Sequence, residues 1–64
     1  MPANYRLKAA RVLLEMTQLA LAEKVGAKEL DISRFETGRA VPPREIKQRI
    51  ADVLQKPTFE LFEC

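Results

Sequence analysis

Apolar residues recur at the spacing of an amphipathic helix along most of this chain. The clearest segment is 44–54, in which the apolar positions include Ile46, Ile50, Val53 and Leu54. These positions are i, i+4, i+7 and i+8, so their side chains share one face of a helix. A strand over 32–35 would have no partner strand, and the sequence therefore predicts an all-α fold.

Capping residues and helix breakers set the predicted boundaries. Asn4 and Thr17 have side-chain oxygens that accept a free backbone N–H at the start of a helix. Gly26 and Gly38 suit the left-handed residue that often ends a helix. Five helices are therefore expected, the first after Asn4 and the others at 18–25, 28–37, 44–54 and 58–63.

The chain has 64 residues, 47% of them hydrophobic, which is enough for one small domain that we take to be 1–64. The core of so short a chain is marginal and usually needs a cross-link, a metal or a second subunit. Cys64 is the only cysteine and histidine is absent, which leaves a partner subunit or very efficient helix packing as the expected support. The sequence leaves open whether Cys64 forms a disulfide between chains.

The composition argues against catalysis and against a bound metal or cofactor. Without histidine, the chain lacks the residues for Ser-His-Asp or Cys-His catalysis, and one thiol cannot build a zinc site. Two glycines are too few for a phosphate-binding loop. No apolar run approaches the roughly 18 residues of a membrane span, and a lone thiol fits a reducing cytoplasm.

Basic residues are concentrated in two parts of a chain whose net charge is only +2. Residues 1–14 contain three basic residues and no acidic one, and 34–44 contains three arginines with a single glutamate. The last segment, 45–64, is slightly acidic. This distribution is typical of a nucleic-acid surface, although an ordinary solvated surface remains the alternative.

Two short predicted helices separated by Gly26 form a candidate helix-turn-helix. Ala22 is small enough for the second helix to cross close above it, and Gly26 makes the turn. Ile32 and Phe35 are expected to anchor the second helix to the core. Gln18 lies at the start of the first helix, where the helix dipole favours a phosphate.

In two runs the chain resembles the phage repressor and Cro helix-turn-helix (XRE) family: Thr17-Gln18-x-x-Leu21-Ala22-Glu23-Lys24-Val25-Gly26 and Ile32-Ser33-Arg34-Phe35-Glu36-x-Gly38. The similarity continues without gaps to Ile50-Ala51, Leu54 and Leu61-Phe62, and so covers nearly the whole chain. The resemblance implies a compact, five-helix, lambda-repressor-like DNA-binding domain of a bacterium or phage.

The resemblance further implies a transcriptional regulator, of the repressor type, that binds double-stranded DNA as a homodimer. Two recognition helices would enter successive major grooves of a palindromic operator, about 34–36 Å apart. The alternative is a protein interaction module of the antitoxin or antirepressor type on the same scaffold, since a fold does not fix a function.

Helix geometry selects the side chains that would read DNA. At about 100° per residue, Ile32 and Phe35 lie on one side of the third helix. The opposite side presents Glu29, Leu30, Ser33, Arg34 and Thr37. The resemblance implies that this side faces the major groove, where arginine bonds guanine, glutamate accepts from cytosine N4, and leucine touches a thymine methyl. Ser33 would bond a base or a phosphate.

The expected phosphate contacts fix the register of the protein on DNA without reading sequence. They are Gln18, Lys28, Thr37, Arg39 and Arg44. Three of the DNA-facing residues have a plainer alternative. Arg34 could be a solvated side chain, Glu29 an acid that stabilises its own helix dipole, and Leu30 a contact of the preceding helix.

Other positions are assigned structural roles by the resemblance. Arg11 and Glu36 match a pair that links the first and third helices, the alternative being two unrelated surface charges. The dimer interface is expected at Phe59, Leu61 and Phe62. The sequence departs from the family at Glu15 and Gln55, where glycine is usual, and at Lys28, which has no acceptor for capping.

Val12, Leu13 and Leu14 are apolar where the family is usually polar. Three consecutive side chains span about 200° of a helix, so they cannot all face one core. We expect either a slightly thicker core or a contact with another protein or subunit.

Overall fold

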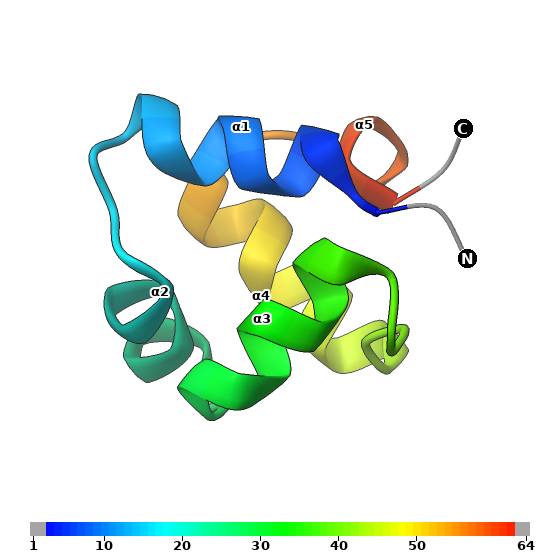
Figure 1. Cartoon of the computed structure of the whole chain (residues 1–64). Helices are drawn as coiled ribbons and strands as arrows, with labels where there is room; N and C mark the ends of the chain where they lie inside the picture. Colours follow the sequence, from blue (N-terminus) through cyan, green and yellow to red (C-terminus); the bar gives the residue numbers. More distant parts are fainter. Residues whose placement is uncertain (1–2, 63–64) are drawn as a thin grey trace.

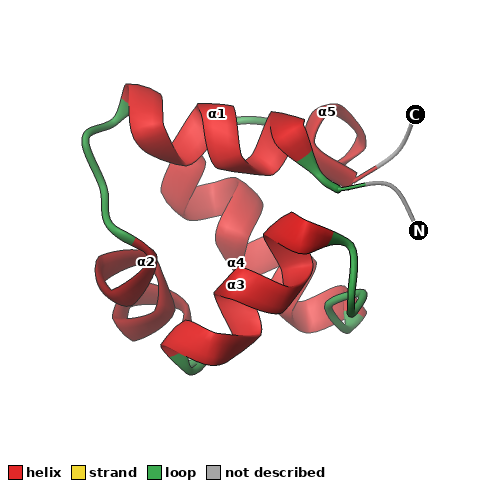
Figure 2. Cartoon of the chain, viewed as in Figure 1, coloured by secondary structure: helices red, strands yellow, loops and turns green. Residues whose placement is uncertain are grey.

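Five helices make up residues 3–62, the part of the chain that this computed structural model describes (Figure 1). They are α1 (Tyr5–Leu13), α2 (Gln18–Val25), α3 (Glu29–Thr37), α4 (Arg44–Leu54) and α5 (Thr58–Phe62). Loops join them without any strand in this range (Figure 2). The predicted all-α, five-helix, repressor-like fold is confirmed. Cys64, whose redox state the sequence left open, lies outside the described residues.

The helix ends follow the local signals in the sequence. Asn4 Oδ1 accepts the backbone N–H of Leu7 at 3.0 Å, and Thr17 Oγ1 accepts that of Ala20 at 3.0 Å. Gly26 ends α2 and Gly38 ends α3, both in the left-handed conformation. The predicted bounds of α2 and α4 are therefore confirmed, while α3 begins one residue later than expected.

Two residues other than glycine also adopt the left-handed conformation. Glu15 has φ 53° and Gln55 has φ 57°. The resemblance implies glycine at both positions, and a Cβ in this conformation strains the backbone.

The core is formed by apolar side chains from all five helices: Leu7, Ala10, Leu21, Ala22, Val25, Ile32, Phe35, Ile50, Ala51, Leu54 and Leu61. Helix α2 contacts α3 and α4, and α1 contacts α3 and α5. Figure 1 shows α1 and α5 on one side of the molecule and α2 on the other, with α3 crossing in front of α4.

Leu61 corrects one prediction from the sequence. We expected it at a dimer interface, but its side chain is 2% exposed and belongs to the core. Helix α5 contacts both α1 and α4, which turns Leu61 inward. Phe62 is half-buried against the same core, and only Phe59 of the three predicted interface residues is largely exposed.

The three consecutive apolar residues at the end of α1 do not thicken the core. Val12, Leu13 and Leu14 are 54%, 76% and 47% exposed. Leu14 recurs at helical spacing with Leu7 and Ala10, but α1 ends at Leu13. The surface beside this helix end is therefore apolar.

Residues 3–62 contain no helix that is long and apolar enough to cross a membrane. Over the same range, no three His, Cys, Asp or Glu side chains come together in a way that would hold a metal ion.

Candidate nucleic-acid interface

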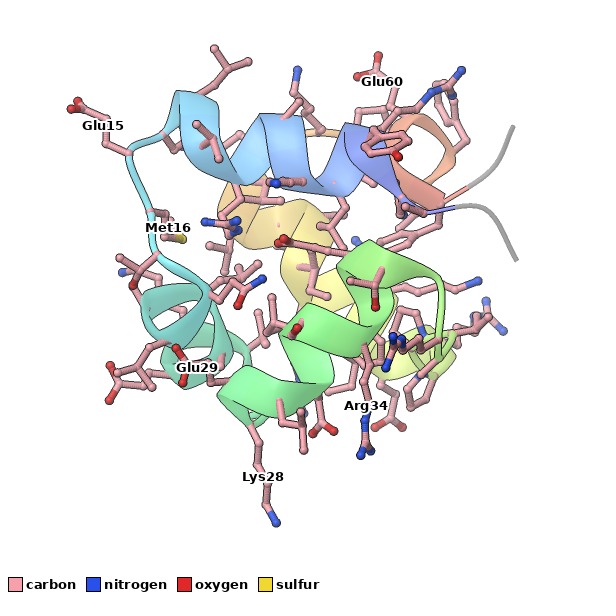
Figure 3. The ribbon with its side chains drawn as sticks, in the orientation of Figure 1. Glu15, Met16, Lys28, Glu29, Arg34 and Glu60 are labelled. Carbon is pink, nitrogen blue, oxygen red and sulfur yellow. The ribbon has the colours of Figure 1, made fainter. Side chains whose placement is uncertain are left out.

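The outer face of α3 is open to solvent, while its inner face is fixed in the core. Ile32 is fully buried and Phe35 nearly so. On the other side, Glu29, Leu30, Arg34 and Thr37 are exposed and Ser33 is half-buried. Arg34 points away from the body of the molecule, as does Lys28 just before the helix (Figure 3). All five predicted outward-facing side chains of α3 therefore lie on one continuous face.

The turn between α2 and α3 sets the angle at which this face is presented. Gly26 has φ 76°, and the N–H of Ala27 donates to the carbonyl of Ala22 at 2.9 Å. Ala22 itself is 1% exposed, so its small side chain is enclosed in the core near the turn. The helix-turn-helix geometry thus depends on one left-handed residue and one small side chain.

The start of α3 is stabilised from within. Lys28 makes no capping bond with its side chain, as expected of a residue without an acceptor. Its backbone N–H donates instead to Asp31 Oδ2 at 3.3 Å. One of the two acids in the first turn therefore holds the helix start, and Glu29 is left as the exposed carboxylate next to Leu30.

Glu36 joins the first three helices through its carboxylate. Arg11 Nε donates to Glu36 Oε2 at 2.6 Å and Arg11 Nη2 to Oε1 at 3.1 Å. Gln18 Nε2 donates to the same Oε1 at 3.1 Å, and Arg11 Nη1 donates to the carbonyl of Met16 at 2.7 Å. The structure therefore brings together Arg11 and Glu36, the pair expected from the resemblance.

Gln18 has a structural contact, with Glu36, in addition to its predicted role as a phosphate contact. Sequence reasoning treated Gln18 only as a phosphate contact, but its side chain is half-buried and one hydrogen of its amide is donated to Glu36. The second hydrogen of the amide remains for a phosphate. No signal in the sequence indicated this bond, because Gln18 and Glu36 lie 18 positions apart.

Two further predicted phosphate contacts, Arg39 and Arg44, lie in the loop after α3 and at the start of α4. Arg39 and Arg44 are both exposed. The backbone N–H groups of Arg39 and Ala40 donate to the carbonyl of Arg34, at 2.9 and 3.3 Å, which ties the loop to the end of α3. Pro42 is buried and anchors the loop between the two arginines. No local pattern in the sequence indicates that Pro42 is buried, because its burial depends on helices that are distant along the chain.

Thr37 is exposed at the end of α3, and its hydroxyl is already engaged. The Oγ1 atom donates to the carbonyl of Ser33 at 2.9 Å and lies 3.3 Å from that of Arg34. A threonine hydroxyl has a single hydrogen, so a phosphate contact by Thr37 would require the hydroxyl to rotate away from the helix.

The predicted dimer residues lie on the other side of the fold from α2. Phe62 packs against its own core, and Lys47 Nζ lies 5.7 Å from the centre of its ring. Phe59 is 60% exposed. Of the predicted set, Phe59 is therefore the residue with a largely exposed apolar side chain.

These features define a helix-turn-helix protein. Its motif consists of α2 and α3, and α3 has a buried inner face and an open outer face. The family model for the helix-turn-helix matches residues 7–61. The chain therefore belongs to the helix-turn-helix family, and it is of the phage repressor type.

Two solved structures are similar to this chain. One is the P22 c2 repressor protein in complex with the synthetic operator 9T in the presence of Tl+, with a TM-score of 0.91 and 27% identity over 98% of this chain and 96% of that one. The other is PlcR of Bacillus thuringiensis in complex with the peptide PapR7 and DNA, with a TM-score of 0.83 and 34% identity. That match covers 91% of this chain and 20% of PlcR. No curated protein matches the sequence.

Proposed function

We propose that this protein is a sequence-specific DNA-binding transcriptional regulator of the repressor type. In this proposal, α3 lies in the major groove of the DNA. The observation that carries the proposal is the outer face of α3, where Glu29, Leu30, Ser33 and Arg34 lie together while Ile32 and Phe35 hold the inner face. The P22 c2 repressor and PlcR, which share this fold, were both solved with DNA.

The roles of the side chains follow from their chemistry. Arg34 bonds guanine O6 and N7, Glu29 accepts from cytosine N4, and Leu30 contacts a thymine methyl. Ser33 bonds a base or a phosphate. Phosphate contacts on the two sides of α3 come from Gln18, Lys28, Thr37, Arg39 and Arg44.

A homodimer on a two-fold site fits this proposal, because a small helix-turn-helix domain reads only one half-site. The second subunit would bury Phe59 and the exposed edge of Phe62 beside it. Leu61 has no part in this interface.

Selection from a random duplex library tests the proposal directly. Purified, reduced protein is used at about 150 mM salt, where binding to phosphates alone is weakened. The expected result is a two-fold site with half-sites about one helical turn, or 34–36 Å, apart. Selection of a single half-site without a symmetric partner would contradict the proposed homodimer. If the folded protein enriched no sequence, the proposed DNA-reading function would be wrong.

A second function is favoured by two specific features of the surface. The exposed carboxylate of Glu29 repels DNA phosphates, and an apolar patch remains on α1. Both suit a protein interaction module, which becomes the better description if the library yields no site.

A further inference from the structure

The outer face of α1 carries an apolar stripe that no other helix of the described range 3–62 covers (Figure 1). Tyr5 and Leu13 are 75% and 76% exposed, at the two ends of the helix, and Val12 is 54% exposed. With about 100° per residue, these three side chains and the exposed Ala9 fall within an arc of about 100°. The stripe therefore faces one direction along the full length of α1.

A groove continues the stripe toward α5. Its volume is about 350 Å³, and the apolar residues that line it are Ala9, Ala10, Leu13 and Leu61. Charged side chains form its rim: Arg6, Lys56 and Glu60. Lys56 and Glu60 pair weakly across one turn, with 3.9 Å between Nζ and Oε2.

The stripe is flanked by basic residues on both sides. Relative to Tyr5, Lys8 lies at about 300° and Arg6 at about 100°, so the two side chains border the apolar arc. No acidic residue occurs between Ala3 and Leu14. A partner that fits this face presents apolar side chains along one line and acidic side chains beside them.

We infer that α1 and the α1–α5 groove are a docking surface for an amphipathic helix of another protein, with apolar residues on its inner face and acidic residues at its margins. The stripe is about 12 Å long from Tyr5 to Leu13 at 1.5 Å per residue. This length matches two turns of a bound helix, which presents anchors at i, i+3, i+4 and i+7.

Charge selects this occupant over a second copy of the chain. Pairing α1 with α1 of another molecule would bring basic margins against basic margins, and like charges across an interface oppose association. Nucleic acid offers no apolar line to match Tyr5, Val12 and Leu13.

The docking surface lies away from the face proposed to read DNA. Figure 3 shows Glu60, on the rim of the groove, on the opposite side of the molecule from Lys28 and Arg34. A helix bound to α1 would therefore leave the outer face of α3 open. The inference does not rest on DNA binding and survives if that function fails.

The test uses the full chain and a fluorescent amphipathic peptide of about five turns, with leucines at the anchor spacing and glutamates at both margins. A matched peptide carries lysine in place of each glutamate. Binding is followed by fluorescence anisotropy, and the site is located from amide chemical shifts of isotope-labelled protein. The expected result is binding of the glutamate peptide only, with shifts confined to α1 and α5.

Variants of the protein separate the apolar and the charged contributions. Leu13→Ser should weaken binding of the glutamate peptide about tenfold, because it removes one buried leucine. Leu19→Ser, at an exposed leucine of α2, is its matched control and should change nothing. Lys8→Glu should weaken binding several-fold, whereas Lys24→Glu on α2 should not. All four positions are exposed, so circular dichroism should show folded variants.

Three outcomes overturn the inference. One is that the lysine peptide binds as tightly as the glutamate peptide. Another is that the α1 variants and their α2 controls lose the same affinity for the glutamate peptide. The third is failure of the glutamate peptide to bind, together with self-association in sedimentation that Leu13→Ser abolishes. That last result would make the stripe an interface between copies of the chain.

Discussion

The guanidinium of Arg11 and the carboxylate of Glu36 form a two-bond ion pair inside the fold, with side chains that are 10% and 3% exposed. The pair joins α1 to the end of α3 across 25 positions of the chain. The carboxylate also accepts from Gln18 in α2. Helix α3, whose outer face is proposed to contact DNA, is therefore bonded through one acidic group to the two helices before it.

Removing one partner of this pair should unfold much of the protein. Arg11→Met leaves a buried carboxylate without its cation, which costs about 3–5 kcal/mol. A single core of this size rarely supplies more than about 3–5 kcal/mol. Urea and thermal unfolding followed by circular dichroism should show a large loss of folded protein at 25 °C.

Two controls define what the ion pair contributes. Lys56→Ala removes the exposed pair with Glu60 and should cost less than about 1 kcal/mol. The double variant Arg11→Met/Glu36→Leu replaces both charges with apolar groups and should recover most of the stability. A double variant as unstable as the single one would mean that the ion pair is not the source of the loss.

Relief of backbone strain should stabilise the fold. Glu15 and Gln55 have positive φ, which costs a residue with a Cβ about 1–2 kcal/mol. Glycine removes that cost but adds freedom to the unfolded chain, so Glu15→Gly and Gln55→Gly should each gain about 0.5–1 kcal/mol. The free energy of unfolding from urea titration measures the change.

Gly26→Ala is the reverse experiment. The new Cβ would stand 3.5 Å from Arg49 Nη1, an ordinary contact, so backbone strain alone should lower the stability, by about 1–2 kcal/mol. If neither the two glycine variants nor Gly26→Ala changed the free energy of unfolding, the positive φ angles would not contribute to stability.

Asn4 bonds to residues near both ends of the described chain. Its replacement should therefore lower the stability more than the loss of a helix cap alone. Its Oδ1 caps α1, while its Nδ2 donates to the carbonyl of Leu61 at 2.7 Å, across 57 positions. Asn4→Ala loses both bonds, at about 1 kcal/mol each. Asn4→Ser keeps the capping oxygen and should lose only about half as much in thermal unfolding. Equal losses in the two variants would show that the bond to Leu61 contributes nothing.

Arg34 and Arg44 should respond differently when DNA binding is measured on the selected site. Arg34→Ala should cost about 1–3 kcal/mol and relax the preference at one base pair. Arg44→Ala should weaken all sequences alike and reduce the salt slope by about one. Titrations over a series of salt concentrations and single-base changes distinguish the two. A uniform loss from Arg34→Ala would make it a phosphate contact.

Local chemistry explains which parts of the fold were predictable. The bounds of α2 and α4 depend on Thr17, Gly26 and the apolar repeat of 44–54, all of which act within a few residues. Likewise, the outward side of α3 follows from Ile32 and Phe35 once they are placed inside. The pairing of Arg11 with Glu36 was reached by resemblance, since nothing near either residue indicates the other.

Long-range contacts explain the predictions that failed. Helix α5 is short, and its apolar residues Phe59, Leu61 and Phe62 cover most directions around it. Nothing in that segment says which of them faces α1 and α4. The exposure of Leu14 has a related reason: Leu14 continues the spacing of Leu7 and Ala10, but α1 ends at Leu13.

The sequence by itself determined the helices, their caps and the outer face of α3, because a cap, a glycine or an apolar period acts over one or two turns. Only the tertiary structure decided that Gln18 shares the carboxylate of Glu36, that Leu61 is buried, and that no other helix within 3–62 covers the apolar stripe of α1. Burial and pairing depend on which helices meet, and those contacts join residues that lie tens of positions apart.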